Sequence, residues 1–128
     1  MERQQNDPIP GTIISADLTV KTTDQVRDFY KQVIGWEHSG LSMGSYEDYV
    51  MTADDGTPVA GICHPEGQNA GLPAVWLVYF GVKDLKTSIE ACRTMGGKIH
   101  FESKELGRAG SYAVIEYPEG AYCAITQI

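Results

Sequence analysis

Two stretches of this chain decide its fold: VKTTDQVRDFYKQVIGWEH, residues 20–38, and VKDLKTSIEACRTMGGKIH, residues 82–100. A shift of 62 positions superimposes them without a gap. The identical pairs are Val20 with Val82, Lys21 with Lys83, Gly35 with Gly97 and His38 with His100. One pair of long repeats indicates two copies of a supersecondary unit and not the many short turns of a solenoid.

Each repeat has the pattern of an amphipathic helix. In the first, apolar residues fall at helical spacing: Val26, Phe29, Tyr30, Val33 and Ile34. Thr22 with Gln25 predicts a capping box at the start, and Gly35 a left-handed end. In the second, Asp84 is the expected cap, and the apolar stripe is formed by Leu85, Ile89 and Cys92 before Gly96-Gly97. We expect each helix to cover the apolar face of its own sheet.

Alternating segments flank both helices. Residues 13–20 and 75–82 predict a strand before each helix, because apolar residues recur at every second position. Three short strands are expected after each helix, at 36–40, 46–52 and 58–63, then at 98–103, 111–116 and 121–127. Asp54-Asp55-Gly56 and Pro118-Glu119-Gly120 predict the turns between the last two strands of each copy. The sequence therefore predicts one α+β domain with two βαβββ modules, at about 11–63 and 74–128, joined by a linker at 64–73.

Composition limits the possible partners. Of 128 residues, 42% are hydrophobic, which is enough for a packed core. Ten basic residues against 17 acidic ones give a net charge of −7, which argues against nucleic acid and anionic membrane as partners. The three cysteines include no CxxC pair, and the start of the chain lacks the pattern of a signal peptide. These features predict a cytoplasmic protein.

Local motifs resemble those of the glyoxalase/bleomycin-resistance/dioxygenase (vicinal oxygen chelate) superfamily. Phe29-Tyr30 followed by Ile34-Gly35-Trp36 is similar to the family's first helix end, and Asp17-Leu18-Thr19 to the first strand of one branch. The segment 79–84 with Met95-Gly96-Gly97-Lys98, and the ending from Gly107-Arg108 to Gly120-Ala121, resemble the second half. Tyr117 departs from the pattern, which usually has Asp in this turn. The resemblance spans about residues 11–128.

The resemblance implies a cupped, incomplete barrel whose concave face holds the site. In metal-dependent members, four concave positions carry His, Glu or Gln. They correspond here to Ser15, Ala60 (or Gly61), Leu77 and Ala124. None of these side chains is an ordinary ligand of a divalent cation, so the resemblance points to the metal-less branch with no cofactor.

Residues at alternate positions of the first strand of each module are expected to face the cup. Asp17 is the most informative, since a carboxylate there could bind a ligand hydroxyl or amine, act as a base, or only order the rim of the cup. Tyr79 and Tyr122 share this parity and could stack on a flat ligand. The expected ligand-binding residues are therefore Ser15, Asp17, Leu77, Tyr79, Tyr122 and Ala124.

Two other candidates have competing interpretations. Trp76 has the parity of the core-facing residues, so we expect it to pack under the second helix. Cys63 beside His64 suggests a nucleophile and its base, although neighbours on a strand point to opposite faces. The histidines are expected to have surface or packing roles and not to bind metal. The sequence does not identify catalytic residues.

The sequence favours a protein that binds a small, partly aromatic molecule, as in bleomycin-resistance members, over an enzyme. The alternative is a metal-dependent lyase, isomerase or dioxygenase of the glyoxalase kind, since the fold hosts both. A third class is a module that pairs with another chain, and a homodimer is compatible with all three.

Overall fold

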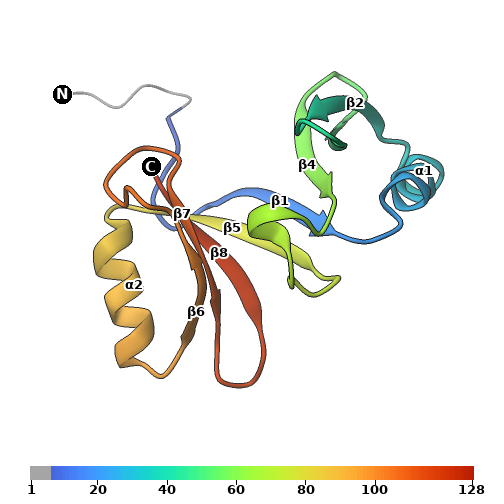
Figure 1. The fold of residues 1–128 in the computed structure, drawn as a ribbon. Helices are drawn as coiled ribbons and strands as arrows, with labels where there is room; N and C mark the ends of the chain where they lie inside the picture. Colours follow the sequence, from blue (N-terminus) through green and yellow to red (C-terminus); the bar gives the residue numbers. More distant parts are fainter. Residues whose placement is uncertain (1–6) are drawn as a thin grey trace. The chain divides into compact units, whose positions relative to one another are not determined.

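The computed structural model of the protein describes residues 7–128. Its elements follow the order β1 (Ile13–Thr19), α1 (Thr23–Ile34), β2 (Glu37–Ser42), β3 (Glu47–Thr52), β4 (Pro58–Cys63), a 3₁₀ turn (Gly67–Asn69), β5 (Trp76–Val82), α2 (Leu85–Thr94), β6 (Lys98–Glu102), β7 (Tyr112–Glu116) and β8 (Tyr122–Gln127) (Figure 1). This order confirms an α+β fold with two βαβββ modules. The predicted strand bounds agree with the observed ones to within about two residues.

The chain divides into two compact units. The N-terminal unit is Ser15–Leu77, and the C-terminal unit combines the described residues up to Ile14 with Val78–Ile128. β1 and β5 each cross a boundary between the units. Thr12 and Gly81 lie together in the C-terminal unit, where the Gly81 amide donates to the Thr12 carbonyl at 3.0 Å.

In the N-terminal unit the strand order is β2-β3-β4-β1, with α1 on one face. Met51 and Ile62 are fully buried in this core, and Val26 and Tyr30 of α1 pack against it. The remaining apolar residues of α1 do not reach the sheet, since Phe29, Val33 and Ile34 are 52% to 62% exposed. The apolar stripe predicted for α1 is therefore wider than the part of the helix that packs on the sheet.

The start of α1 differs from the prediction. The Thr22 side chain makes no capping hydrogen bond, because its backbone (φ −95°, ψ 58°) lies outside the extended region from which a cap reaches the first turn. Instead, the Thr23 hydroxyl donates to the Val20 carbonyl at 2.8 Å. The predicted capping box is therefore wrong, whereas Gly35 ends the helix at φ +90° as expected.

Trp76 lies in the N-terminal core. Its Nε1 donates to the Tyr30 hydroxyl at 3.1 Å, and the two rings meet edge to face with centroids 5.3 Å apart. Trp36 contacts both rings. The expectation that Trp76 packs under the second helix is wrong, because the first residues of β5 belong to the unit that contains α1.

The C-terminal unit has the order β5-β8-β7-β6, and α2 packs on one face (Figure 1). Its buried core consists of Leu85, Ile89, Ala113 and Ile125. Asp84 caps α2 as predicted, accepting from the Thr87 amide at 3.3 Å. The Gln127 side chain fixes the same helix start, since its Oε1 accepts from the Leu85 amide at 2.9 Å.

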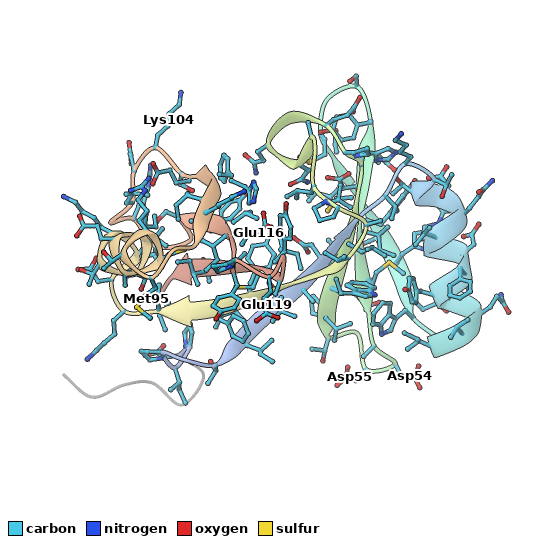
Figure 2. The ribbon with its side chains drawn as sticks, turned by 90° about the horizontal axis from the view of Figure 1, so that it is seen from below. Asp54, Asp55, Met95, Lys104, Glu116 and Glu119 are labelled. Carbon is cyan, nitrogen blue, oxygen red and sulfur yellow. The ribbon has the colours of Figure 1, made fainter. Side chains whose placement is uncertain are left out.

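The turn between β3 and β4 is acidic. Figure 2 shows Asp54 and Asp55 projecting from the turn between β3 and β4, where Asp55 accepts from the Thr57 amide at 2.9 Å. This confirms the first predicted turn. Neither α-helix within residues 7–128 is long and apolar enough to cross a membrane.

Candidate functional site

The sheet of the N-terminal unit has a polar face on the side away from α1. Tyr49 and Ile62 pair across β3 and β4 and pack in the α1 core. Because side chains alternate along a strand, their neighbours Asp48 and Cys63 point to the opposite side. Asp17 of β1 joins them there, since its charge acts on the Cys63 thiol. We call this side, with Asp17, Asp48 and Cys63, the N-terminal face.

Asp48 is the buried anchor of the N-terminal face. Only 4% of the residue is exposed, and one carboxylate oxygen accepts from the His64 amide at 2.8 Å. The same oxygen lies 3.2 Å from His64 Nδ1. A buried carboxylate needs such partners, because a lone charge would carry a large desolvation cost. The pair therefore fixes the chain where it leaves β4.

Cys63 is a poor nucleophile in this environment. Burial, followed by the negative charges of Asp17 and Asp48, raises the pKa of its thiol from 9.0 to about 12. His64 follows the last residue of β4, so strand alternation does not separate it from Cys63, and both contact Asp48. The histidine ring binds the carboxylate, so the geometry gives no support to a nucleophile and base formed by Cys63 and His64.

Gly61 makes room for Asp17. The two residues pair across β1 and β4, and a Cβ built on Gly61 would lie 2.5 Å from Asp17 Oδ1. No real Cβ tolerates this separation, so any other residue at 61 would displace the carboxylate. Asp17 thus owes its position over the sheet to the absence of a side chain opposite it.

We expect Gly61→Ala to lower the free energy of unfolding by about 1–3 kcal/mol, because the half-buried Asp17 carboxylate has to move. Gly40→Ala is the matched control: its Cβ would lie 2.6 Å from Glu47 Oε2, but Glu47 is long and exposed and can rotate away. Urea unfolding of both variants tests this. Equal costs at the two positions would contradict the interpretation, and Asp17→Ala should relieve the cost at Gly61.

The side of the C-terminal sheet opposite α2 is aromatic. Tyr79 and Tyr112 have ring centroids 5.7 Å apart, and Phe101 lies 5.0 Å from Tyr112. Tyr79 pairs with Ala124 across β5 and β8, so a small residue stands beside the rings. We call this side, with Tyr79, Phe101, Tyr112 and Tyr122, the C-terminal face.

A β-bulge adds His100 to the C-terminal face. The pairing of β6 with β7 shifts between Ile99 and Phe101, so that His100 has no partner in the register. A bulge redirects side chains, and here it lets two chain neighbours lie on one face. Phe101 contacts Tyr112, while the His100 ring stacks on Tyr122 with centroids 4.8 Å apart. Regular alternation in the sequence could not have predicted this pair.

Glu116 completes the polar end of the C-terminal face. Its Oε1 lies 2.7 Å from His100 Nε2, and it also accepts a hydrogen bond from Tyr122. The hydrogen bond with His100 holds the pKa of Glu116 below its ordinary value. Desolvation, followed by the bond to Glu116, raises the pKa of Tyr122. At neutral pH the cluster therefore presents a carboxylate and a protonated tyrosine.

The expected ligand-binding residues fall in different surroundings. Asp17, Tyr79 and Tyr122 are half-buried members of the clusters described above, and Ser15 is half-buried on β1. Leu77 is 4% exposed and Ala124 is fully buried, so neither side chain is open to solvent. Glu116 and His100 complete the Tyr122 cluster, although neither was among the expected ligand-binding residues.

The side chains at the metal positions do not fit a divalent cation. Leu77 and Ala124 have no donor atom, and Ser15 offers only a hydroxyl. Within residues 7–128, no three side chains of His, Cys, Asp or Glu group together in a way that could hold a metal ion. Metal independence remains a prediction.

Sequence comparison finds relatives with related names. Over 115 residues the chain is 28% identical to "Putative glyoxylase CFP32" of Mycobacterium tuberculosis, which covers 90% of this chain and 43% of that protein. It is 27% identical to "Anthracycline biosynthesis protein DnrV" of Streptomyces peucetius over 128 residues, which covers 91% of this chain and 46% of that protein. The chain thus spans about half the length of these curated relatives. No family model matches the sequence.

The fold matches solved structures at lower identity. A member of the glyoxalase/bleomycin resistance protein/dioxygenase superfamily from Vibrio splendidus superimposes with a TM-score of 0.59 at 12% identity, which covers 91% of this chain and all of that one. Structural likeness at this identity establishes the fold alone, whereas the glyoxylase relative adds likeness in sequence. Together with the two βαβββ modules, these matches show that the chain has the fold of the glyoxalase/bleomycin resistance/dioxygenase superfamily and is similar in sequence to a protein named as a putative glyoxylase.

Proposed function

We propose that the chain binds a small, partly aromatic molecule without a catalytic metal. The observation that carries this proposal is the C-terminal face, where Tyr79, Phe101 and Tyr112 are in ring contact on the side of the sheet opposite α2. Aromatic side chains offer large contact areas and preferred stacking geometries to a flat ligand.

Polar groups at the end of this face suit recognition of a ligand with a donor group. The Glu116 carboxylate can accept a hydrogen bond from a ligand hydroxyl or amine, and Tyr122 offers a hydroxyl beside it. Apolar rings with a few placed polar groups are the usual composition of a small-molecule site. The relative named for anthracycline biosynthesis supports a fused-ring aromatic ligand class.

A thermal-shift screen against aromatic molecules of one to four rings, with the anthracycline doxorubicin among them, tests the proposal. We expect stabilisation by at least one compound to persist in EDTA, because binding needs no cation. Tyr79→Ala should then weaken binding at least tenfold in a fluorescence titration. Phe29→Ala, which removes an exposed ring from α1, is the matched control and should leave the affinity unchanged.

An absence of stabilisation by every compound would contradict the proposal, and so would an equal loss of affinity in both variants. The second candidate is a metal-dependent lyase, isomerase or dioxygenase, favoured by the relative named as a putative glyoxylase. Elemental analysis of tag-free protein separates the two. Close to one nickel, zinc, iron or manganese ion per chain would overturn the metal-free proposal.

A further inference from the structure

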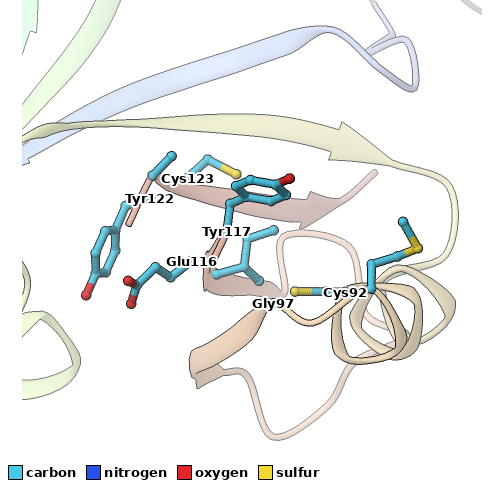
Figure 3. A pocket seen from close by; sticks show the side chains of 9 residues that line it. Cys92, Gly97, Glu116, Tyr117, Tyr122 and Cys123 are labelled. Atoms are coloured by element: carbon cyan, nitrogen blue, oxygen red, sulfur yellow. The ribbon is translucent and has the colours of Figure 1, made fainter. Parts of the chain in front are cut away.

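A concave site lies on the side of the C-terminal sheet that α2 covers, at the end of this helix. Figure 3 shows the pocket between Cys92 of α2, Gly97 just before β6, and the hairpin that joins β7 to β8. Its volume is about 280 Å³, and all of its lining residues belong to the C-terminal unit. Cys92 and Cys123 both line it, and neither takes part in the aromatic cluster.

The walls of this pocket are apolar and sulfur-rich. Met95, Cys92 and Cys123 contribute sulfur atoms, and among the described lining residues Glu116 is the one that carries a charge. The Glu116 carboxylate lies at the rim of the pocket and already forms a hydrogen bond with His100. Burial, followed by the nearby Cys92, raises the pKa of the Cys123 thiol, which keeps it neutral. An anionic ligand would find no lining cation to compensate its loss of water.

Small residues keep the pocket open. A Cβ on Gly97 would lie 2.5 Å from Cys92 Sγ, so the wall can hold only glycine there without rearrangement. Ala121, at the start of the hairpin's return, adds a single methyl group. Side chains of ordinary size at these two positions would occupy much of the space. An apolar cavity of ~150 Å³ already accepts a benzene ring, so this one has room for a fused two-ring system.

We propose that this pocket binds a neutral, apolar molecule of about two aromatic rings on the side of the C-terminal sheet that α2 covers. The site selects against acids because its one lining charge is negative. It selects for flat apolar molecules because its lining combines the rings of Tyr117 and Tyr122 with sulfur-bearing and aliphatic side chains. Glu116 and Tyr122 line this pocket and also belong to the C-terminal face, so the two sites meet at that end of the sheet. Cys92 and Ala121 belong to the pocket alone, and Tyr79 to the C-terminal face alone.

Two fluorescent probes that share one skeleton test the charge selection. 2-Naphthol is neutral at pH 7, whereas 6-hydroxynaphthalene-2-sulfonate adds a sulfonate to the same two rings. Titrations in about 0.5 M salt screen the net charge of the chain. We expect saturable binding of the neutral probe at one site per chain, and binding of the sulfonate at least tenfold weaker. Absence of saturable binding by the neutral probe, or equal affinities, would overturn the proposal.

Two variants in which phenylalanine replaces alanine locate the bound probe. Ala121→Phe should fill the pocket and weaken the neutral probe at least tenfold, and since Ala121 is exposed the fold should accept the ring. Ala109→Phe adds the same ring at an exposed loop position outside the pocket and should change nothing. Tyr79→Ala, on the other face, should also leave the probe bound. A loss with Tyr79→Ala and none with Ala121→Phe would overturn this proposal while it supported the C-terminal face.

A measurement on the unmodified chain covers the case in which Ala121→Phe does not fold. The neutral probe should slow alkylation of Cys92 by N-ethylmaleimide at least threefold, because the bound probe covers the thiol. Peptide mass spectrometry measures the rate. Cys63 lies in the other unit and serves as the internal control. An unchanged rate at Cys92 would overturn the proposal.

Discussion

Cys63 in the native protein should react with iodoacetamide at least tenfold more slowly than in the urea-unfolded chain at about pH 8. The thiol of an unfolded chain titrates near 9.0, whereas burial and the charges of Asp17 and Asp48 raise the pKa of native Cys63 to about 12. Three pH units lower the thiolate fraction ~1000-fold. A more basic thiolate is also a stronger nucleophile, which recovers part of this loss. The pKa shift alone therefore leaves a rate about 30-fold lower.

The pH profile separates this charge effect from simple steric cover. In the unfolded chain the rate should level off above pH 9, whereas in the native chain it should keep rising toward pH 12. The sign for stability follows from the same shift. Between pH 9 and about 12 the native thiol stays protonated while the thiol of the unfolded chain ionises, which favours the unfolded state. The contribution of Cys63 to the free energy of unfolding is therefore complete below pH 9 and is lost as the pH rises toward 12.

A pair of substitutions tests the cause. Asp48→Asn removes one of the two charges but keeps a carbonyl that can accept from the His64 amide, so Cys63 should react faster than in the parent protein. Asp55→Asn removes a carboxylate from the exposed β3–β4 turn and should not change the rate. Peptide mass spectrometry after timed alkylation measures both. A native Cys63 as reactive as the unfolded one would contradict the assignment.

The repeat made most of the fold predictable. A shift of 62 residues aligned two helix ends that the structure places at Gly35 and just after Thr94, and the alternating segments became strands close to their expected bounds. These features depend on local patterns, because apolar periodicity and turn residues act within a few positions of the chain. Asp84 was predictable as a cap for the same reason.

The sequence-based predictions failed where contacts between distant segments of the chain determine the structure. Trp76 has core parity, but nothing in the sequence near it says that its partner is Tyr30, 46 positions earlier in the chain. The apolar stripe on α1 did not show that Phe29, Val33 and Ile34 stay exposed. That surface is compatible with the expected homodimer, which remains a prediction.

The candidate site was predictable in part. Strand parity picked out Asp17, Tyr79 and Tyr122, which lie in the polar and aromatic clusters described above. It could not find His100 with Phe101, because a bulge is set by the pairing of β6 with β7 and leaves no periodic signal. It also gave no indication that Asp48 would anchor His64 across β3 and β4.

The second large effect is expected for Ile89→Ala, which should lower the free energy of unfolding by about 2–5 kcal/mol. Ile89 is 1% exposed and packs with Leu85, Ala113 and Ile125, so truncation leaves a cavity between α2 and the sheet. Ile34→Ala is the matched control, since Ile34 is 52% exposed at the end of α1 and should cost little. Urea unfolding followed by circular dichroism measures the difference.

Tryptophan fluorescence adds a second probe, because both tryptophans, Trp36 and Trp76, lie in the N-terminal unit. If the units unfold together, Ile89→Ala should shift the fluorescence and dichroism transitions equally. If they unfold separately, only the dichroism should show an earlier loss. A cost below about 1 kcal/mol by both probes would contradict the packing described for Ile89.

The same variant separates stability from binding. Ala113 faces α2 while its neighbour Tyr112 belongs to the C-terminal face, so one strand supplies the core on one side and the aromatic rings on the other. Ile89→Ala should therefore leave ligand affinity unchanged wherever the protein remains folded. Tyr112→Ala should do the reverse, weakening the ligand at least tenfold with a smaller loss of stability, because Tyr112 is only half-buried. Parallel losses in both variants would mean that the ligand does not bind on the aromatic side of the sheet.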